Sequence, residues 1–128
     1  MLQDACEGYQ SQIILPQAEP NSEPCWFGYL ITMKKNEPRG INKDLFVWYL
    51  ERMGIQTRPL FGGNLILHPW FNGIRDTDAY RVVGELKNSD FITNHTFWVG
   101  VAPNLTGDRI QYISDAIYSF FRYGHNYI

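Results

Sequence analysis

The sequence predicts an α/β or α+β fold, in which a small mixed sheet is flanked by helices. Short runs rich in aromatic and β-branched residues, typical of strands, alternate with two longer runs in which apolar residues recur at helical spacing. Both longer runs carry capping residues at their ends. The chain has 128 residues, of which 45% are hydrophobic, so we expect residues 1–128 to form one domain around one core.

The predicted strands are short and are bounded by polar or proline-containing turns. Residues 13–16 form a brief strand candidate, and the polar loop 17–24 separates it from the aromatic run CWFGYLITM. We expect that run to form a largely buried strand over residues 26–33. Two further strands are expected, and the first of them completes a β-α-β unit: residues 56–60 and 97–101.

The first predicted helix covers residues 42–53. Asn42 is placed to cap its N-terminus, Ile41 and Phe46 occupy the two positions of a hydrophobic staple, and Gly54 supplies a left-handed residue at its end. Four apolar side chains recur at helical spacing and are expected to form its buried face: Leu45, Trp48, Tyr49 and Met53.

The last predicted helix covers residues 106–123 and repeats these signals. Thr106 is the expected cap, and Gly124 follows the expected end. Between the two long helices, a short helix capped by Asn88 is expected over residues 88–93. The buried stripe of the last helix is expected to contain Ile110, Ile113, Ile117 and Phe120.

Charge and composition argue against several classes of partner. The net charge is -2 at pH 7 and the basic residues are scattered, so we expect no nucleic-acid partner. The chain has no apolar run long enough to span a bilayer and no basic and apolar leader at its start, so we expect a cytoplasmic protein that does not enter a membrane. Cys6 and Cys25 lack the spacing of a metal site and are expected to be free thiols.

The stretch RPLFGGNLILHPWF, residues 58–71, is the first candidate for a functional site. It follows a predicted strand, which is where α/β proteins place many ligand contacts. Gly62 and Gly63 would let a ligand approach the backbone, Asn64 offers a donor and an acceptor, and Arg58 offers a fixed charge for a phosphate or carboxylate. A tight turn with a solvent-facing asparagine explains the pattern equally well, so both interpretations stay open.

The sequence contains no legible catalytic constellation. His68, His95 and His125 are dispersed, have no carboxylate or cysteine at ligand spacing, and are expected to be structural. There is no nucleophile and base pair and no phosphate-binding loop motif. The lysines stand among polar neighbours and are expected to be solvated at the surface: Lys34, Lys35, Lys43 and Lys87.

Four blocks of the sequence carry a resemblance to a known family. The blocks are CWFGYLITM, RPLFGGNLILHPWF, YRVVGELKNSDFITNHTFWVGVAPNLT and the closing amphipathic helix. In this order they resemble the C-terminal part of the DegT/DnrJ/StrS family of pyridoxal-phosphate (PLP) enzymes, which act on nucleotide sugars. The sequence is most similar to the CDP-4-keto-6-deoxyglucose 3-dehydrase branch, which serves lipopolysaccharide biosynthesis. The resemblance runs from about Ile13 to Phe121.

The resemblance implies that this chain is the C-terminal small domain of a fold-type I PLP enzyme roughly three times as long. The large cofactor domain would then be absent from the chain. PLP, the lysine or histidine beside it and any iron–sulfur cluster would belong to that absent part. We therefore expect no catalytic, cofactor-binding or metal-binding residue in this chain, and no activity from the chain alone.

The resemblance also implies that the Gly-Gly stretch borders the nucleotide-sugar cleft. Leu67 and His68 stand where an Arg-Gln type pair is expected, so the identity of the sugar nucleotide stays open. The choice between a dehydrase and an aminotransferase stays open as well. The expected substrate-binding residues are Arg58, Phe61, Gly62, Gly63, Asn64 and Arg81.

The expected partners are the large PLP domain or a second copy of the chain in a homo-oligomer, together with a nucleotide sugar. A free-standing sugar-nucleotide-binding or dimerisation module without activity is the alternative. A third class, a structural interaction domain, is indicated by a surplus of large aromatic side chains, including Trp26, Trp48, Trp70 and Trp98.

Overall fold

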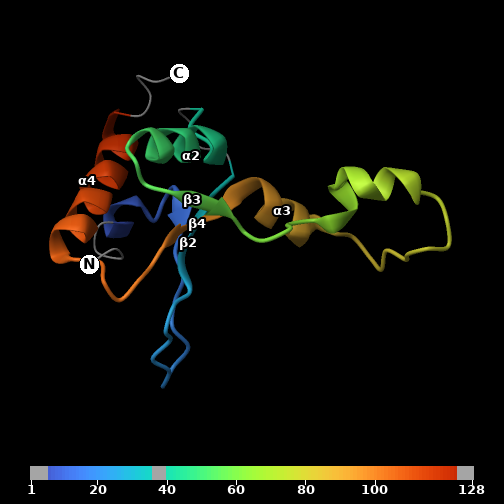
Figure 1. The fold of residues 1–128 in the computed structure, drawn as a ribbon, viewed down its shortest axis with the longest axis horizontal. Coiled ribbons are helices and arrows are strands. Elements are labelled where there is room, and N and C mark those ends of the chain that lie inside the picture. The colour runs from blue at the N-terminus through green and yellow to red at the C-terminus, as the bar shows by residue number, and fades with distance from the viewer. Residues whose placement is uncertain (1–5, 36–39, 124–128) are drawn as a thin grey trace.

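The structure is a computed structural model that describes residues 6–35 and 40–123. Figure 1 shows the path of the chain. The strands and long helices follow one another in the order that the sequence predicts. The elements are η1 (Glu7–Tyr9), β1 (Ile13–Ile14), β2 (Gly28–Met33), α2 (Lys43–Arg52), β3 (Thr57–Pro59), η2 (Leu65–Leu67), η3 (Pro69–Gly73), α3 (Lys87–His95), β4 (Thr96–Gly100) and α4 (Gly107–Tyr123).

The four described strands form one sheet in the order β1-β2-β4-β3. Each neighbouring pair is antiparallel, so the expected mixture of parallel and antiparallel pairing is not found. β2 and β3 run in the same direction on either side of α2, but β4 lies between them and pairs with both. The expected β-α-β unit is therefore split by β4, and the α+β class is confirmed.

Strands β1, β2 and β3 are shorter than predicted, whereas β4 has the predicted length and begins one residue earlier, at Thr96. β1 contains only Ile13 and Ile14, and the strand expected from residue 26 begins at Gly28. β3 ends at Pro59, which has no backbone N–H to donate and is tolerated because β3 lies at the edge of the sheet.

Helix α2 begins where the sequence predicts, but its buried face is rotated. The side chain of Asn42 accepts a hydrogen bond from the backbone N–H of Leu45 at 2.9 Å, so the predicted cap is confirmed. Of the predicted face, Tyr49 is buried and Leu45 is partly buried, whereas Trp48 and Met53 are 47% and 37% exposed. The side chains of α2 that the core takes in are Phe46, Tyr49 and Leu50.

The other two helices show one wrong prediction and one confirmed stripe. Helix α3 begins at Lys87, so Asn88 lies inside the helix and does not cap it; Leu86 at the cap position makes no side-chain cap bond. Helix α4 begins directly after Thr106, and Gly124 lies outside the described residues. The buried residues of α4 are Ile113, Ala116, Ile117, Phe120 and Phe121, while Ile110 is partly buried.

None of the helices in the described ranges has both the length and the apolarity that a membrane crossing requires.

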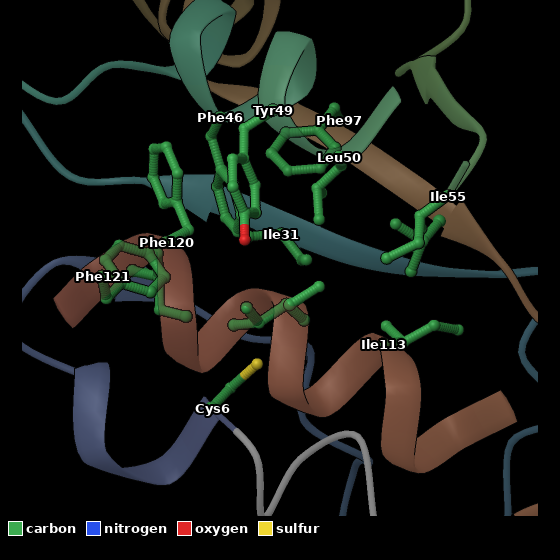
Figure 2. Close-up of a cluster of buried hydrophobic side chains, with 14 of the residues drawn as sticks. Cys6, Ile31, Phe46, Tyr49, Leu50, Ile55, Phe97, Ile113, Phe120 and Phe121 are labelled. Carbon is green, nitrogen blue, oxygen red and sulfur yellow. The ribbon is translucent and has the colours of Figure 1, made fainter. Parts of the chain in front are cut away.

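The core lies between α2, α4 and one face of the sheet (Figure 2). Phe46 is fully buried at its centre, with its ring stacked on Phe120 at 4.2 Å and meeting Phe97 edge-on at 5.3 Å. Alternate residues of the strands face this cluster because side chains alternate across a sheet. The strand residues in the cluster are Ile13, Tyr29, Ile31, Met33, Phe97 and Val99.

A long connection leaves the body of the protein between β3 and α3. We call residues 61–86 the arm; in Figure 1 its yellow-green part extends beyond α3, away from the sheet. Inside the arm, Phe71 is buried and its ring lies 3.9 Å from that of Trp70 and 5.0 Å from that of Tyr80. Many other apolar side chains of the arm are exposed: Phe61, Leu65, Leu67, Trp70, Val82 and Val83.

Removing the central ring of the core tests the packing. Replacing Phe46 with alanine is expected to lower the free energy of unfolding by about 3–5 kcal/mol, because the site loses a fully buried ring and its neighbours cannot close the cavity. The half-exposed Trp48, on the same helix, is the matched control, and Trp48→Ala is expected to cost about 1 kcal/mol or less. Urea titration measures both, and equal losses would contradict the observed rotation of α2.

The buried thiol of Cys6 makes stability depend on pH. Burial raises its pKa from 9.0 to about 11, because the thiolate cannot be solvated there. The folded state therefore holds this proton in a pH range where the unfolded chain releases it. The contribution of Cys6 to the free energy of unfolding is complete below about pH 9 and is lost as the pH rises to about 11. Urea titrations from pH 8 upward should show a steeper loss for the wild type than for Cys6→Ala. Parallel curves would contradict a buried thiol.

Candidate functional site

The Gly-Gly stretch forms a tight turn at the base of the arm. Phe61 and Gly63 both adopt positive φ angles, of 47° and 58°, and the N–H of Gly63 donates to the carbonyl of Leu60 at 3.2 Å. A Cβ at Gly63 would lie 2.6 Å from Oγ1 of Thr93, so α3 approaches the backbone here as closely as glycine permits. Within the described residues, the space that the missing side chain of Gly63 leaves is therefore occupied by a threonine of the protein itself.

Asn64 is the most strongly held residue of this turn. Its side chain is only 4% exposed, so the interpretation with a solvent-facing asparagine is wrong. Its amide Nδ2 donates to Oδ1 of Asp90 at 2.6 Å, and its Oδ1 accepts from the N–H of Ile66 at 3.3 Å. Its backbone N–H donates to Oγ1 of Thr93 at 2.7 Å. Asn64 thus joins the turn to α3 and caps η2.

The turn has a second brace on its other side. Nε2 of His68 lies 2.5 Å from the carbonyl oxygen of Gly62, and a Cβ at Gly62 would lie 2.8 Å from Cδ2 of Leu65. His68 therefore has the structural role that the sequence analysis expects. His95, whose Nδ1 lies 2.9 Å from the carbonyl oxygen of Phe91, has one as well.

Arg58 lies on the face of the sheet opposite the core. The strand register aligns Leu30, Trp98 and Arg58 in one row across β2, β4 and β3. In β2 and β4 the neighbouring residues, among them Ile31 and Phe97, face the core, so this row faces the other side. The guanidinium carbon of Arg58 lies 6.0 Å from the centre of the Trp98 ring.

A hydrogen-bonded contact fixes the strand that carries Arg58. Oε1 of Glu51, near the end of α2, accepts from the N–H and from Oγ1 of Thr57 at 2.6 and 2.7 Å. These bonds lower the pKa of the Glu51 carboxyl, because they favour the carboxylate. Trp98 holds the other end of the strand, because its Nε1 donates to the carbonyl of Pro59 at 3.2 Å.

Arg58 and Phe61 line one open cleft, which we call the aromatic cleft. Its volume is about 620 Å³, and its lining consists of Phe27, Arg58, Pro59, Phe61 and Trp98. A smaller hollow of about 160 Å³ shares three of these aromatic residues and adds Trp26, Gly28, Leu30 and Leu60. The combined lining is apolar and aromatic, with Arg58 as its one charged side chain among the described residues.

The six expected substrate-binding residues are thus divided among three places. Arg58 and Phe61 line the aromatic cleft, whereas Gly62, Gly63 and Asn64 form the turn that follows it. Arg81 is exposed in the arm, and no contact within the described residues brings it to the cleft.

Phe27 and Trp98 also line the cleft, but the sequence analysis did not assign them to the site. The content of aromatic residues draws attention to Trp98 as part of a surplus. Its neighbours become known only with the pairing of β2, β4 and β3, which joins segments far apart in the sequence.

The described residues do not fit PLP, which the resemblance implies for the family. Such a site needs a phosphate cup, a carboxylate for the ring nitrogen and a lysine or histidine beside the reacting carbon. Lys34 donates to the carbonyl of Gln10 and Lys87 pairs with Glu85. Lys43 is only 17% exposed and donates to the carbonyl of Thr93 at 2.8 Å, so the expectation that it is solvated is wrong.

A methyl group at residue 63 tests the turn. Gly63→Ala is expected to cost about 1–2 kcal/mol for the left-handed backbone, with a further cost from the overlap with Thr93. The N–H of Asn64, which donates to Thr93, should then exchange with solvent at least about tenfold faster. Gly73→Ala is the matched control, because nothing lies within 4 Å of its added methyl. Unchanged exchange in Gly63→Ala would contradict the described turn.

Comparison with known proteins identifies a family and two relatives that match most of the chain. The chain matches the DegT/DnrJ/EryC1/StrS aminotransferase family over residues 1–118. It is 45% identical over 107 residues to the lipopolysaccharide biosynthesis protein RfbH of Salmonella typhimurium, covering 84% of this chain and 23% of that protein. It is 43% identical over 108 residues to the dTDP-4-dehydro-2,6-dideoxy-D-glucose 3-dehydratase of Saccharopolyspora spinosa, covering 84% of this chain and 22% of that protein. The chain spans less than a quarter of the length of these two relatives.

Solved structures share the fold at lower identity. The E. coli GDP-4-keto-6-deoxy-D-mannose-3-dehydratase with bound hydrated PLP aligns with a TM-score of 0.72 and 22% identity, over 91% of this chain and 28% of that chain. The aminotransferase from Psychrobacter cryohalolentis aligns with a TM-score of 0.79 and 18% identity, over 94% of this chain and 32% of that chain. The family match over residues 1–118 confirms the resemblance: the chain belongs to the DegT/DnrJ/EryC1/StrS aminotransferase family.

Proposed function

We propose that the chain is the C-terminal small domain of a PLP-dependent nucleotide-sugar 3-dehydratase or aminotransferase. The enzyme would serve deoxysugar or lipopolysaccharide biosynthesis. In this role the chain forms one wall of the nucleotide-sugar cleft and has no activity alone. A large domain supplies the cofactor and the groups that act on the sugar.

The observation that carries this proposal is the identity with two relatives over most of the chain. One is named a lipopolysaccharide biosynthesis protein and the other a sugar 3-dehydratase, and each match covers 84% of this chain. Because the matches cover less than a quarter of either relative, more than three quarters of each relative lies outside them. That remainder is large enough for a cofactor domain of ordinary size.

The described side chains support a role in binding and not in catalysis. The aromatic cleft offers Arg58 as its one charged group among the described residues. An arginine suits a phosphate or carboxylate, because its guanidinium is always charged and donates in a planar fork. It is a poor proton carrier for the same reason. The lysines Lys34, Lys43 and Lys87 are engaged with the protein itself.

We assign the arm to contacts with the large domain of the same enzyme. Its exposed apolar residues include Trp70 at 62% and Val83 at 71% exposure. Several large apolar side chains exposed on one segment point to an interaction site. The arm also has its own small packing centre at Phe71, so it can keep its shape while its outer side chains contact another domain.

A chimaera tests the proposal. In it, this chain replaces the matching segment of the dTDP-4-dehydro-2,6-dideoxy-D-glucose 3-dehydratase of Saccharopolyspora spinosa. We expect the chimaera to bind PLP and to dehydrate the sugar nucleotide, whereas the relative truncated before this segment is inactive. The chain alone, treated with PLP and then borohydride, should show no single lysine labelled stoichiometrically in a peptide map.

Two results would contradict the proposal. One is stoichiometric labelling of one lysine in the chain alone, which would place a cofactor site in the chain itself. The other is a folded chimaera that binds PLP but does not turn over the sugar nucleotide. The native relative, purified in parallel, is the control for the assay.

A further inference from the structure

We propose that the aromatic cleft holds the nucleoside diphosphate part of the sugar nucleotide. The base lies against the rings of Phe27 and Trp98, and a phosphate pairs with Arg58. This inference depends on the proposed function, because it names the part of the substrate that the wall recognises.

The strand register places the main parts of the cleft side by side. Leu30, Trp98 and Arg58 form one row on the face of the sheet that lies away from the core. This face therefore offers an apolar residue, a flat indole and a cation side by side across three neighbouring strands. A nucleotide carries a flat base and a phosphate on one sugar, so one molecule satisfies both the ring and the cation.

A glycine beneath the indole lets Trp98 lie flat on the sheet. A Cβ at Gly28 would overlap the six-membered ring of Trp98 and would lie 2.8 and 2.9 Å from its Cδ2 and Cζ3 atoms. The partner of Gly28 across β4 is Gly100, so this row of the sheet carries no side chains at all. Because this row has no side chains, the ring of Trp98 lies along the sheet and forms the base of the cleft.

Two exposed phenylalanines line the cleft beside the ring of Trp98. Phe27 and Phe61 are 76% and 77% exposed, although both are large and apolar. Phe27 precedes β2, and its ring centre lies 5.3 Å from that of Trp98, tilted by 51°. Phe61 belongs to the turn at the base of the arm, which is held by Asn64. Nucleobases stack on aromatic side chains of this kind.

The charge of Arg58 is available to a ligand. Within the described ranges no carboxylate pairs with it, and its guanidinium carbon lies 6.0 Å from the centre of the Trp98 ring. The indole N–H of Trp98 is already used by the carbonyl of Pro59. The cleft therefore offers a ligand one cation and several flat apolar surfaces.

This chemistry fits a base and phosphate better than it fits a hexose. A sugar ring requires several hydrogen-bonding partners, and the lining of the cleft offers one polar side chain, Arg58. The volume of about 620 Å³ lies in the usual range for small-molecule sites. The large domain would then contact the sugar, where the chemistry takes place.

Nuclear magnetic resonance on this chain tests the inference. Titration with CDP, dTDP or GDP should shift the indole N–H signal of Trp98, with an affinity in the millimolar range because one wall covers little of the ligand. Inorganic pyrophosphate and the free nucleosides, which carry only one of the two groups, should bind at least about tenfold more weakly. Equal shifts from pyrophosphate, or no shift from any nucleotide, would overturn the inference.

Substitutions locate the binding. Phe27→Ala and Arg58→Ala should each weaken nucleotide binding about tenfold. The matched controls are Trp48→Ala and Arg52→Ala, because Arg52 also lies over a tryptophan ring, at 5.0 Å, but on α2 outside the cleft. Gly28→Ala should abolish binding by displacing Trp98, with the fold checked by circular dichroism. Nucleotide binding that survives both cleft substitutions would overturn the inference.

The chimaera separates this inference from the proposed function. If the chimaera is active and Phe27→Ala raises its KM for the sugar nucleotide with kcat unchanged, both stand. If it is active and Phe27→Ala leaves KM unchanged, the base lies elsewhere and only this inference fails. If it binds PLP and does not turn over the sugar nucleotide, the proposed function fails.

Discussion

The pairing of β4 with both β2 and β3 is the constraint on which the rest of the structure depends. Side chains alternate along a strand, so a central strand supplies both faces of the sheet at once. Phe97 and Val99 of β4 enter the core with Phe46, whereas Trp98 between them faces the aromatic cleft. A shift of β4 by one residue would exchange these roles and expose the core residues. Core packing and the cleft are therefore fixed by the same register.

The turn at the base of the arm is tied to the body by α3. Asn64 bonds to Asp90 and Thr93 of that helix, and Lys43 of α2 bonds to the carbonyl of Thr93. The C-terminal part of α3 is thus linked to the turn on one side and to α2 on the other. Since β4 begins directly after α3, the same helix also fixes where β4 enters the sheet. The position of Phe61 at the rim of the cleft follows from these contacts.

The sequence predicts the features that depend on neighbours along the chain. The cap at Asn42, the left-handed Gly54 and the stripe of α4 are local, and the structure has all of them. The buried face of α2 depends on where the sheet and α4 lie, and this is why Trp48 is exposed against the prediction, while Phe46, expected only as part of the N-terminal staple, lies at the centre of the core.

For the candidate site, the sequence points to the turn and to Arg58, but not to the contacts that the turn makes. Gly63 and Asn64 show the composition of a ligand loop, yet α3 fills the space that the glycine leaves. Thr93 and Asp90 lie more than twenty residues away in the sequence, so no local pattern reveals that contact. Phe27 and Trp98 meet only through strand pairing, which depends on distant segments.

The measurement that tests this account most directly is a crystal structure of the chimaera with a bound nucleotide sugar. The account predicts that the base lies against Phe27 and Trp98, that a phosphate contacts Arg58, and that the sugar points away from this chain toward the large domain. A base bound outside the aromatic cleft, or a sugar held by the turn at Gly63 and Asn64, would contradict it.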